Sequence, residues 1–340
     1  MEQKQLTCDE FIQRVVTKEM YWMSDATDEL RLDVGTACNC SPSYKYLTLS
    51  SDNAHGYVHA APGAGLSNFL TSTLLTAMFR YAPSELSVYL LDAEGGNTEA
   101  FVDTESDIAN YPHFKYIHNI ASVGHFFYLM REVKNEVNRR YKLLRTFSCD
   151  TFPELRRRVC EAHMGEVVLK AEAGSWRQMV LSKQWVDTSL NVVGNLPRML
   201  VVFNRIDKLL DDQNINSETR KEMLDALTHV LMVGPQLGIH CLFFSQDPRP
   251  LAGEMYKTYC DLRICGRCRE DVSQALMDTE IAATIKEKYG FFYSIDCNKN
   301  TPCLWSTPCA DVNSVNSLSS EMFYLLQAFA EDKEMAVLNK

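Results

Sequence analysis

The fold is indicated by one stretch of sequence, YVHAAPGAGLSNFLTSTLLTAMFRY, which occupies residues 57–81. It begins with a short apolar run at Tyr57–Ala60, continues through a loop that contains two glycines, and becomes helical in pattern from Ser67 to Tyr81. A strand, a glycine loop and a helix in this order form a phosphate-binding unit, because amides of the loop and of the first helical turn point toward an anion. The stretch therefore predicts an α/β fold.

The glycine loop departs from a working phosphate-binding motif. That motif reads GxxxxGK[ST], in which the lysine reaches the terminal phosphates and the hydroxyl binds magnesium. Ala60 stands in place of the first glycine and Leu66 in place of the lysine, while Ser67 keeps the hydroxyl. We expect Leu66 to make the pocket more apolar. The degenerate nucleotide site predicted here comprises Gly63, Ala64, Gly65, Leu66 and Ser67.

A second motif lacks its acidic pair. The apolar run Met199–Phe203 predicts a buried strand. In a hydrolysing site this strand ends in Asp-Glu, where the Asp supports magnesium and the Glu activates water, but here Asn204 and Arg205 follow it. The nearby Asp207 is expected to cap the next segment or to lie in solvent. We therefore expect no catalytic residue, no required cofactor and only weak binding of ATP with magnesium.

Strands and helices alternate along most of the chain. Apolar runs predict further strands at Ser87–Leu91, Leu237–Ser245, Leu262–Cys265 and Phe291–Ile295, and helical periodicity appears at Val123–Arg145, Phe152–Ala162, Glu218–Val233 and Val272–Met277. This alternation is typical of a mostly parallel central sheet flanked by helices on both faces. We divide the chain into an N-terminal extension packing on the core (1–45), a main domain (46–310) and a C-terminal helix or tail (311–340).

Composition narrows the range of partners. The formal net charge of −10 disfavours binding to nucleic-acid phosphates. No apolar run reaches the roughly 18 residues that span a bilayer, and the first residues lack the apolar centre of a signal peptide. We expect a cytoplasmic protein without a direct membrane span. Arg156–Arg158 predict an exposed helix face, and His113 and His240 are expected to be structural.

The chain has twelve cysteines, and Cys265 and Cys268 form a CxxC pair. Such a pair is half of a zinc site, which needs a second half at ligand spacing. Cys297, Cys303 and Cys309 follow at even six-residue intervals, which do not match that spacing. We expect no metal and interpret the CxxC pair as packing at a strand end.

With these motifs in place, the chain resembles the FtsK/SpoIIIE-type motor domains, a branch of the P-loop ATPases, over about residues 30–310. The most specific match is EVNRRYKL at 136–143, which is similar to the family's ExxRRYKL helix. LGIH at 237–240, followed by SQDP at 245–248, is similar to the family's AGIHL…ATQRP strand. The resemblance implies a RecA/FtsK-like, three-layer P-loop NTPase fold. It places Gln246 where the family senses the terminal phosphate, and makes Arg263 a candidate for ring contact with a neighbouring subunit.

Within this family, decayed motor copies are typical of the type VII secretion ATPases EccC and EssC, which carry several modules in one chain. Leu91–Asn97 resembles their segment better than that of the DNA translocases. The resemblance implies a degenerate, C-terminal type of module, a pseudo-ATPase, within a larger secretion ATPase at the cytoplasmic face of the membrane. Its implied role is to bind the signal-peptide tails of small helical substrates, to assemble with sister ATPase modules in the same chain or in a ring, or to regulate them.

Two alternatives remain open. One is a purely structural scaffold, which would bind neither nucleotide nor peptide, and the other is a weakly active motor subunit of a DNA translocase or a mobile element. The family's DNA translocases carry a basic winged-helix reader after the motor, and nothing after Pro308 resembles one. The acidic charge of the chain also counts against this alternative.

Overall fold

A computed structural model of the chain describes residues 5–38, 44–96, 98–102, 110–167, 185–187, 192–194, 196–247, 255–286, 289–296 and 299–338. Asn97, Pro248 and Cys297, which entered the sequence analysis, lie outside these ranges.

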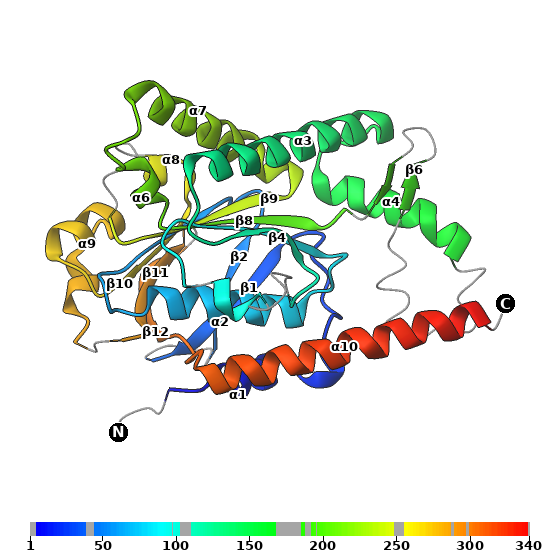
Figure 1. Cartoon of the computed structure of the whole chain (residues 1–340), viewed down its shortest axis with the longest axis horizontal. Coiled ribbons are helices and arrows are strands. Elements are labelled where there is room, and N and C mark those ends of the chain that lie inside the picture. The colour runs from blue at the N-terminus through cyan, green and yellow to red at the C-terminus, as the bar shows by residue number, and fades with distance from the viewer. Residues whose placement is uncertain are drawn as a thin grey trace.

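One ten-stranded sheet organises the fold (Figure 1), in the order β2-β1-β12-β11-β10-β3-β9-β8-β4-β5. Its parallel part contains β3 (Gly56–His59), β4 (Leu86–Asp92), β5 (Phe114–His118), β8 (Arg198–Asn204), β9 (Ile239–Ser245) and β10 (Leu262–Gly266). Its antiparallel part adds β1 (Leu30–Ala37), β2 (Tyr44–Leu49), β11 (Phe291–Asp296) and β12 (Lys299–Ser306). The predicted parallel sheet is confirmed, and the antiparallel part extends it beyond β10.

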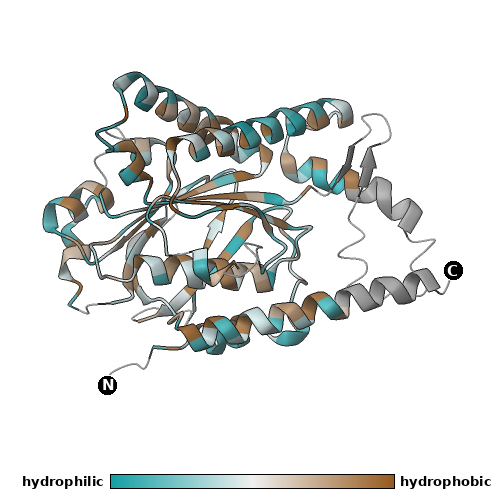
Figure 2. Cartoon of the chain, in the orientation of Figure 1, coloured by the Kyte–Doolittle hydropathy of each residue, from teal (hydrophilic) through white to brown (hydrophobic). Residues whose placement is uncertain are grey.

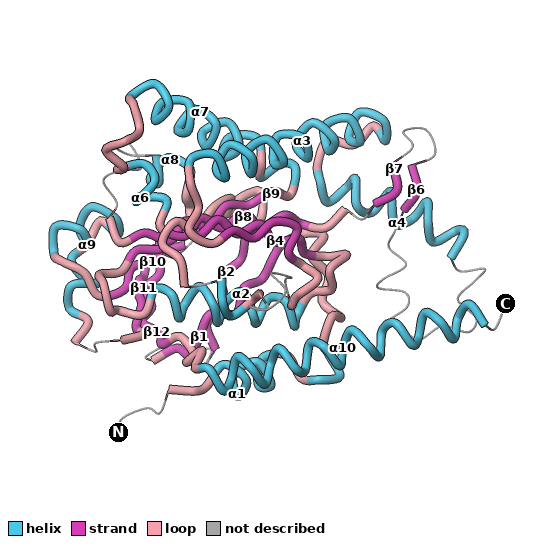
Figure 3. The backbone as a smooth tube through the Cα atoms, in the orientation of Figure 1, coloured by secondary structure: helices cyan, strands magenta, loops and turns pink. Residues whose placement is uncertain are grey.

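Helices cover both faces of this sheet, as Figures 1 and 3 show. One face carries α1 (Cys8–Val15), α2 (Leu66–Arg80) and α10 (Val312–Leu338), and the other carries α3 (Val123–Phe147), α4 (Phe152–Val167), α6 (Ile206–Leu210), α7 (Ser217–Val233) and α8 (Met255–Tyr259). The helix α9 (Glu270–Met277) follows β10. Short helical turns lie at Lys18–Met20, Thr98–Ala100, Pro235–Leu237 and Glu280–Thr284, and β6 (Trp185–Asp187) pairs with β7 (Val192–Gly194).

Two apolar cores lie on opposite sides of the sheet because successive strand residues point to opposite faces. In β3, Tyr57 joins the core under α3 and α7, whereas Val58 joins the core under α2. Figure 2 shows the strands as predominantly hydrophobic. The three-layer architecture predicted from the sequence is thus confirmed.

The two ends of the chain pack together on the α2 face. α1 lies along α10, where the hydroxyl of Ser314 donates to Asp9 at 2.9 Å. The proposed boundary after residue 45 falls inside β2, which pairs with β1 in the central sheet. No helix among the described residues combines the length and apolarity needed to cross a bilayer.

The arginines of α4 occupy two different environments. Arg157 and Arg158 are exposed, as predicted. For Arg156 the prediction is wrong, since its guanidinium is buried and donates to the buried carboxylate of Glu85 at 2.7 Å. This contact pairs the two buried charges and connects α4 to the start of β4.

Both histidines singled out from the sequence are buried. The Nε2 of His113 donates to the carbonyl of Tyr81 at 2.7 Å, and the Nδ1 of His240 donates to the carbonyl of Ala54 at 2.7 Å. These contacts to backbone fit the structural role expected for each.

Candidate functional site

The carboxyl ends of four neighbouring parallel strands form the candidate site. In register, His59 of β3 lies beside Ser245 of β9, Phe244 of β9 beside Asn204 of β8, and Asn204 beside Asp92 of β4. The glycine loop leaves β3 at this same edge. Ligands of open α/β sheets bind at the carboxyl edge, so this is where the predicted nucleotide site would lie.

The two glycines of the loop adopt left-handed backbone conformations. Gly63 and Gly65 have φ angles of +75° and +101°, which favour glycine. Gly65 is the N-cap of α2 and offers no capping side chain, so amides of the first helical turn lack an acceptor within the helix. A Cβ at Gly65 would lie 2.8 Å from the backbone nitrogen of Gly290, so only glycine fits there.

Neighbouring segments hold the loop in place. The amide of Ala61 donates to the carbonyl of Arg267 after β10 at 2.9 Å, and the amide of Ala64 donates back to Ala61 at 3.0 Å. The amide of Gly290 donates to the carbonyl of Ala64 at 2.9 Å. The loop therefore depends on two segments that come much later in the chain.

Leu66 and Ser67 point to different surroundings. Leu66 is 4% exposed and belongs to the core under α2, while Ser67 is exposed at the helix start. This placement is contrary to our expectation that Leu66 presents an apolar surface to a ligand. Ser67 is the side chain of the loop that remains available to a phosphate or a metal.

Asn204, the first of the two residues that stand in place of the acidic pair, hydrogen-bonds to the aspartate that holds the turn after β4. Its amide nitrogen donates to Oδ1 of Asp92 at 2.7 Å. The same oxygen accepts the amides of Glu94 and Gly95, both at 3.0 Å. Asp92 is completely buried, so Asn204 supplies a donor that an Asp at this position would lack.

The second substitution, Arg205, is the centre of a polar network. Its Nη1 donates to Glu94 at 2.7 Å and to Oε1 of Gln246 at 2.8 Å. Its Nε donates to Asp207 at 3.1 and 3.2 Å. The side chain of Lys208 completes the network by donating to Glu94 at 2.8 Å.

Asp207 is an acid of this network and not a solvent-facing residue. It lies in the first turn of α6, whose N-cap is Arg205, so it is not the cap of this helix. It is 2% exposed, so the expectation of a solvent position is wrong. Burial raises its pKa, and the opposing contacts with Arg205 do not fully compensate. Although burial disfavours the guanidinium charge, Asp207 and Glu94 raise the pKa of Arg205.

The network does not fit a magnesium ion. Two cations, Arg205 and Lys208, neutralise two carboxylates, Asp207 and Glu94, so the formal sum is zero. A metal at this edge would have to displace the guanidinium from both acids. Within the described part of the chain, no group of three or more potential metal ligands is gathered.

His59 completes the edge next to the glycine loop. It is 3% exposed, and burial lowers its pKa to about 4, with Asp247 opposing and Arg205 adding to the decrease. The ring is therefore neutral at pH 7, and it contributes no charge to phosphate binding.

Arg263 of β10, the candidate for ring contact, is paired within its own chain. Its Nη1 donates to Asp278 at 2.7 Å and to the carbonyl of Leu276 at 2.9 Å. The side chain is 20% exposed. Any contact with a second subunit would have to share this guanidinium with Asp278.

The sequence match on α3 has a structural basis. Arg140 is 1% exposed, and its guanidinium donates to the carbonyls of Leu237 at 2.6 Å and Pro197 at 2.7 Å, just before β9 and β8. Its Nε donates to Glu136 at 2.6 Å. Through Arg140, α3 is thus hydrogen-bonded to the segments just before β8 and β9, the two strands whose carboxyl ends contribute to the site.

Two participants in the network were missed from the sequence, Glu94 and Lys208. Glu94 follows β4 and Lys208 lies in α6, more than a hundred residues later. The available signal was their position just after strand ends, but only the register of β4 and β8 brings them together.

Comparison with known proteins places this site in a family. A sequence model of the FtsK/SpoIIIE family matches residues 21–250. Among curated proteins, no sequence matches the chain significantly.

Solved structures with the same fold come from secretion and conjugation. The chain is similar to the cytoplasmic domain of the type VII secretion ATPase EccC from Thermomonospora curvata, with a TM-score of 0.65 and 16% identity over 94% of this chain and 34% of that chain. It is also similar to ATPases 2 and 3 of the same EccC in complex with a signal sequence peptide (TM-score 0.61, 14% identity, 89% and 47% of the two chains).

A conjugation coupling protein of pCW3, TcpA, in a monomer form with ATPγS, is a further neighbour (TM-score 0.57, 17% identity, 86% and 70% of the two chains). At identities of 14–17%, the structural similarity establishes the fold and nothing further. The chain spans about a third of the EccC cytoplasmic domain.

Proposed function

The chain belongs to the FtsK/SpoIIIE family, and we propose that it is a catalytically impaired ATPase module of a type VII secretion motor. Its role would be to bind the signal-peptide tails of substrates, or to assemble with and regulate an active sister module. The cytoplasmic face of the membrane would be its place of action.

The network around Arg205 is the observation that supports a loss of catalysis. The family's motors have an acidic pair after this strand, and this chain has a guanidinium paired with Glu94 and Asp207 and bonded to Gln246. The positions that would hold magnesium and orient water are thus occupied by internal contacts. Because phosphoryl transfer relies on those two functions, little rate enhancement would remain.

Nucleotide binding is a separate property, since the backbone of the glycine loop is retained. The nucleotide site would comprise Gly63–Ser67, Asn204, Arg205 and Gln246. Without the lysine, the site lacks charge-assisted hydrogen bonds worth about 1.5–3 kcal/mol each. Binding of ATP would accordingly be weak and would gain little from magnesium.

The proposed role in substrate binding rests on the likeness to EccC, whose ATPases 2 and 3 have been solved with a signal sequence peptide. The test measures fluorescence anisotropy of a labelled secretion-substrate tail with the full chain. Saturable binding would support the role in substrate binding, with a scrambled tail as the control. Equal binding of both tails would leave assembly or regulation as the role.

The motor alternative makes the opposite prediction. A weakly active DNA-translocase or mobile-element subunit would hydrolyse ATP in the presence of magnesium and would lose this activity in Ser67→Ala. It would also bind DNA in a salt-dependent manner. Both results together would replace the proposed function with this one.

A further inference from the structure

A pair of thiols that the proposed function does not use lies beside the glycine loop. Cys265 is in β10 and is fully buried, and Cys268 follows the strand and is half-buried. Their sulfur atoms are 3.4 Å apart, and both cysteines are free thiols. A disulfide requires about 2.05 Å between sulfurs, so only a small movement separates the pair from a covalent bond.

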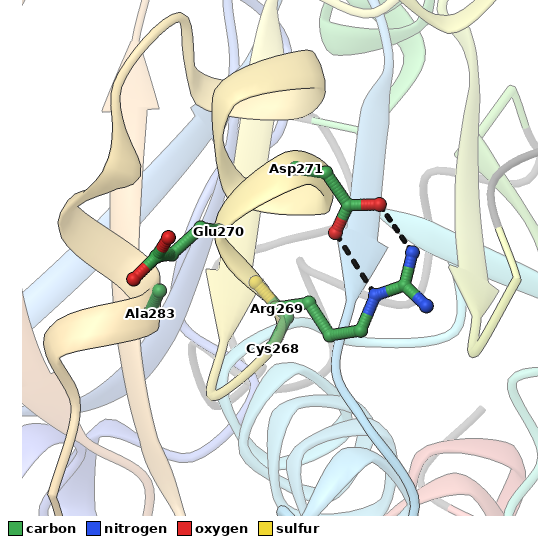
Figure 4. Close-up of a pocket in the computed structure, with 5 residues that line it drawn as sticks. All are labelled: Cys268, Arg269, Glu270, Asp271 and Ala283. Carbon is green, nitrogen blue, oxygen red and sulfur yellow. Dashed lines mark hydrogen bonds and ion pairs between the residues drawn. The ribbon is translucent and has the colours of Figure 1, made fainter.

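Cys268 is reachable from solvent through an open pocket. The pocket is lined by Cys268, Arg269, Glu270, Asp271 and Ala283. Figure 4 shows the first four around the start of α9 and Ala283 on the helical turn Glu280–Thr284. The Nε of Arg269 donates to Asp271 at 2.9 Å, and Figure 4 shows this pair on one side of the pocket and Glu270 on another. A small polar reagent can therefore approach Cys268, while Cys265 stays behind it.

The two thiols are electronically different. The hydrogen bond from Cys265 lowers the pKa of the Cys268 thiol, while the same contact and burial raise the pKa of Cys265. Attack on a disulfide requires a thiolate, so the accessible member of the pair is also the better nucleophile. The buried member is placed to attack second.

We propose that Cys265 and Cys268 form a reversible thiol–disulfide site that reacts with low-molecular-weight disulfides through this pocket. The thiolate of Cys268 attacks one sulfur of the reagent, forms a mixed disulfide and releases one thiolate. The thiol of Cys265 then loses its proton and attacks Cys268, which forms the internal disulfide and releases the second thiolate. The protein loses two electrons and two protons, and the reagent becomes two thiols.

This site is connected to the glycine loop. The carbonyl of Arg267, between the two cysteines, accepts the amide of Ala61 at 2.9 Å. The adjacent Gly266 packs so closely on Ala60 that an added Cβ would lie 2.9 Å from that side chain. Closure of the disulfide would move the segment that holds the loop. This consequence depends on the geometry of the loop and not on whether the module hydrolyses ATP.

The test treats the reduced full chain with glutathione disulfide, alkylates the remaining thiols and maps tryptic peptides by mass spectrometry. Trypsin cuts after Arg263, Arg267 and Arg269, so the disulfide would join Ile264–Arg267 to Cys268–Arg269. We expect this linked pair, lighter by two hydrogen atoms than the sum of its parts and separated again by dithiothreitol. Absence of the linked pair under conditions that oxidise other thiols of the chain would overturn the proposal.

Variants assign the order of the steps. Cys265→Ala should trap a glutathione adduct on Cys268, and Cys268→Ser should leave Cys265 unmodified because it is buried. Cys309→Ser, which removes another half-buried thiol, should form the linked pair as the wild type does. If Cys265→Ala fails to fold, the order of alkylation in the wild type replaces it, with Cys268 expected first. Reaction of Cys265 before Cys268 in either experiment would contradict the mechanism.

Hydrogen exchange tests the connection to the loop without any nucleotide. The peptide that contains Ala61 should exchange faster in the oxidised chain, because the bond to Arg267 is disturbed. Unchanged exchange of this peptide in a sample that is fully oxidised would contradict the coupling. The proposed function would stand or fall separately, on hydrolysis and peptide binding.

Discussion

The Nη1 of Arg205 donates a hydrogen bond to Oε1 of Gln246 at 2.8 Å, across the carboxyl ends of β8 and β9. The resemblance to the family implies that Arg205 stands in place of one acid of the acidic pair and that Gln246 stands where the terminal phosphate is sensed. If so, two positions that act on a nucleotide in working motors are bonded to each other. On the proposed function, this contact would keep the fold while an internal network takes the place of the catalytic edge.

Removal of the Arg205 guanidinium should destabilise the protein. In Arg205→Met, the 2% exposed Asp207 loses its partner, and we expect the free energy of unfolding in urea to fall by about 3 kcal/mol at pH 7. The control is Lys208→Met, whose ion pair with Glu94 is more exposed and should be worth less than about 1 kcal/mol. Equal losses in the two variants would contradict the central position of Arg205.

The loss of unfolding free energy in Arg205→Met should also depend on pH. Burial already raises the pKa of Asp207 in the wild type, and loss of Arg205 should raise it further. A raised folded pKa gives stability at low pH that is lost as the pH rises through that value. The difference between variant and wild type should therefore shrink as the pH falls from 7 through the raised pKa of Asp207. A difference that stays constant would show that Asp207 is not the group left unpaired.

Neighbouring arginines of α4 should respond very differently to substitution. Arg156→Met breaks a buried ion pair with Glu85, and we expect a loss of about 3–5 kcal/mol. Arg157→Met breaks an exposed pair with Asp28 and should cost less than about 1 kcal/mol. Chemical denaturation of both variants measures the difference, and similar losses would place Arg156 at the surface.

Glu136 should contribute to stability in a defined pH range. Burial opposes its charge, but Arg140 and Arg139 lower its pKa from 4.5 to about 2. At about 1.4 kcal/mol per pKa unit, this corresponds to about 3 kcal/mol that is present above pH 4.5 and lost as the pH falls toward 2. Glu136→Gln should therefore be less stable than the wild type at pH 7, with a gap that narrows below pH 4.5. A gap that widens at low pH would contradict this assignment.

The two glycines of the loop should tolerate alanine unequally. Gly65→Ala adds a side chain to a residue whose φ is left-handed, and its Cβ would lie 2.8 Å from the backbone nitrogen of Gly290. The loop or Gly290 must therefore move. At Gly63 a Cβ would meet nothing within 4 Å, and only the backbone penalty of about 1–2 kcal/mol applies. Thermal unfolding should show a clearly larger loss for Gly65→Ala.

Most strands of the parallel part were predictable because they are buried on both faces, whereas β5, which has no fully buried residue, was not predicted. The run Met199–Phe203 shows this, since every residue of β8 is buried and the sequence is continuously apolar. β1 was not predictable in this way, because its Asp33 interrupts the apolar pattern. Asp33 is nonetheless buried, and it pairs both with the neighbouring Arg31 and with Arg80, which comes 47 residues later. The contact with Arg80 leaves no local signal in the sequence.

The sequence predicts which motif residues of the site are lost, and this stays a prediction, but it could not predict the contacts of the residues that replace them. Leu66, Asn204 and Arg205 can be recognised from their position in the motifs. Their new contacts depend on the register that sets Asp92 beside Asn204, which places Glu94 and Gln246 on either side of Arg205. We also expected Leu66 to make the pocket more apolar because it stands in place of the lysine, whereas an apolar side chain gains more by joining the core.

The most direct test of the central claim is a titration calorimetry and turnover experiment with Mg-ATP on the wild-type chain, beside Ser67→Ala and an active motor of the family. The account predicts weak binding that magnesium does not enhance, and no hydrolysis above the Ser67→Ala baseline, while the active motor turns over. Tight, magnesium-dependent binding with hydrolysis that disappears in Ser67→Ala would show that the network around Arg205 opens and that the module is a working ATPase.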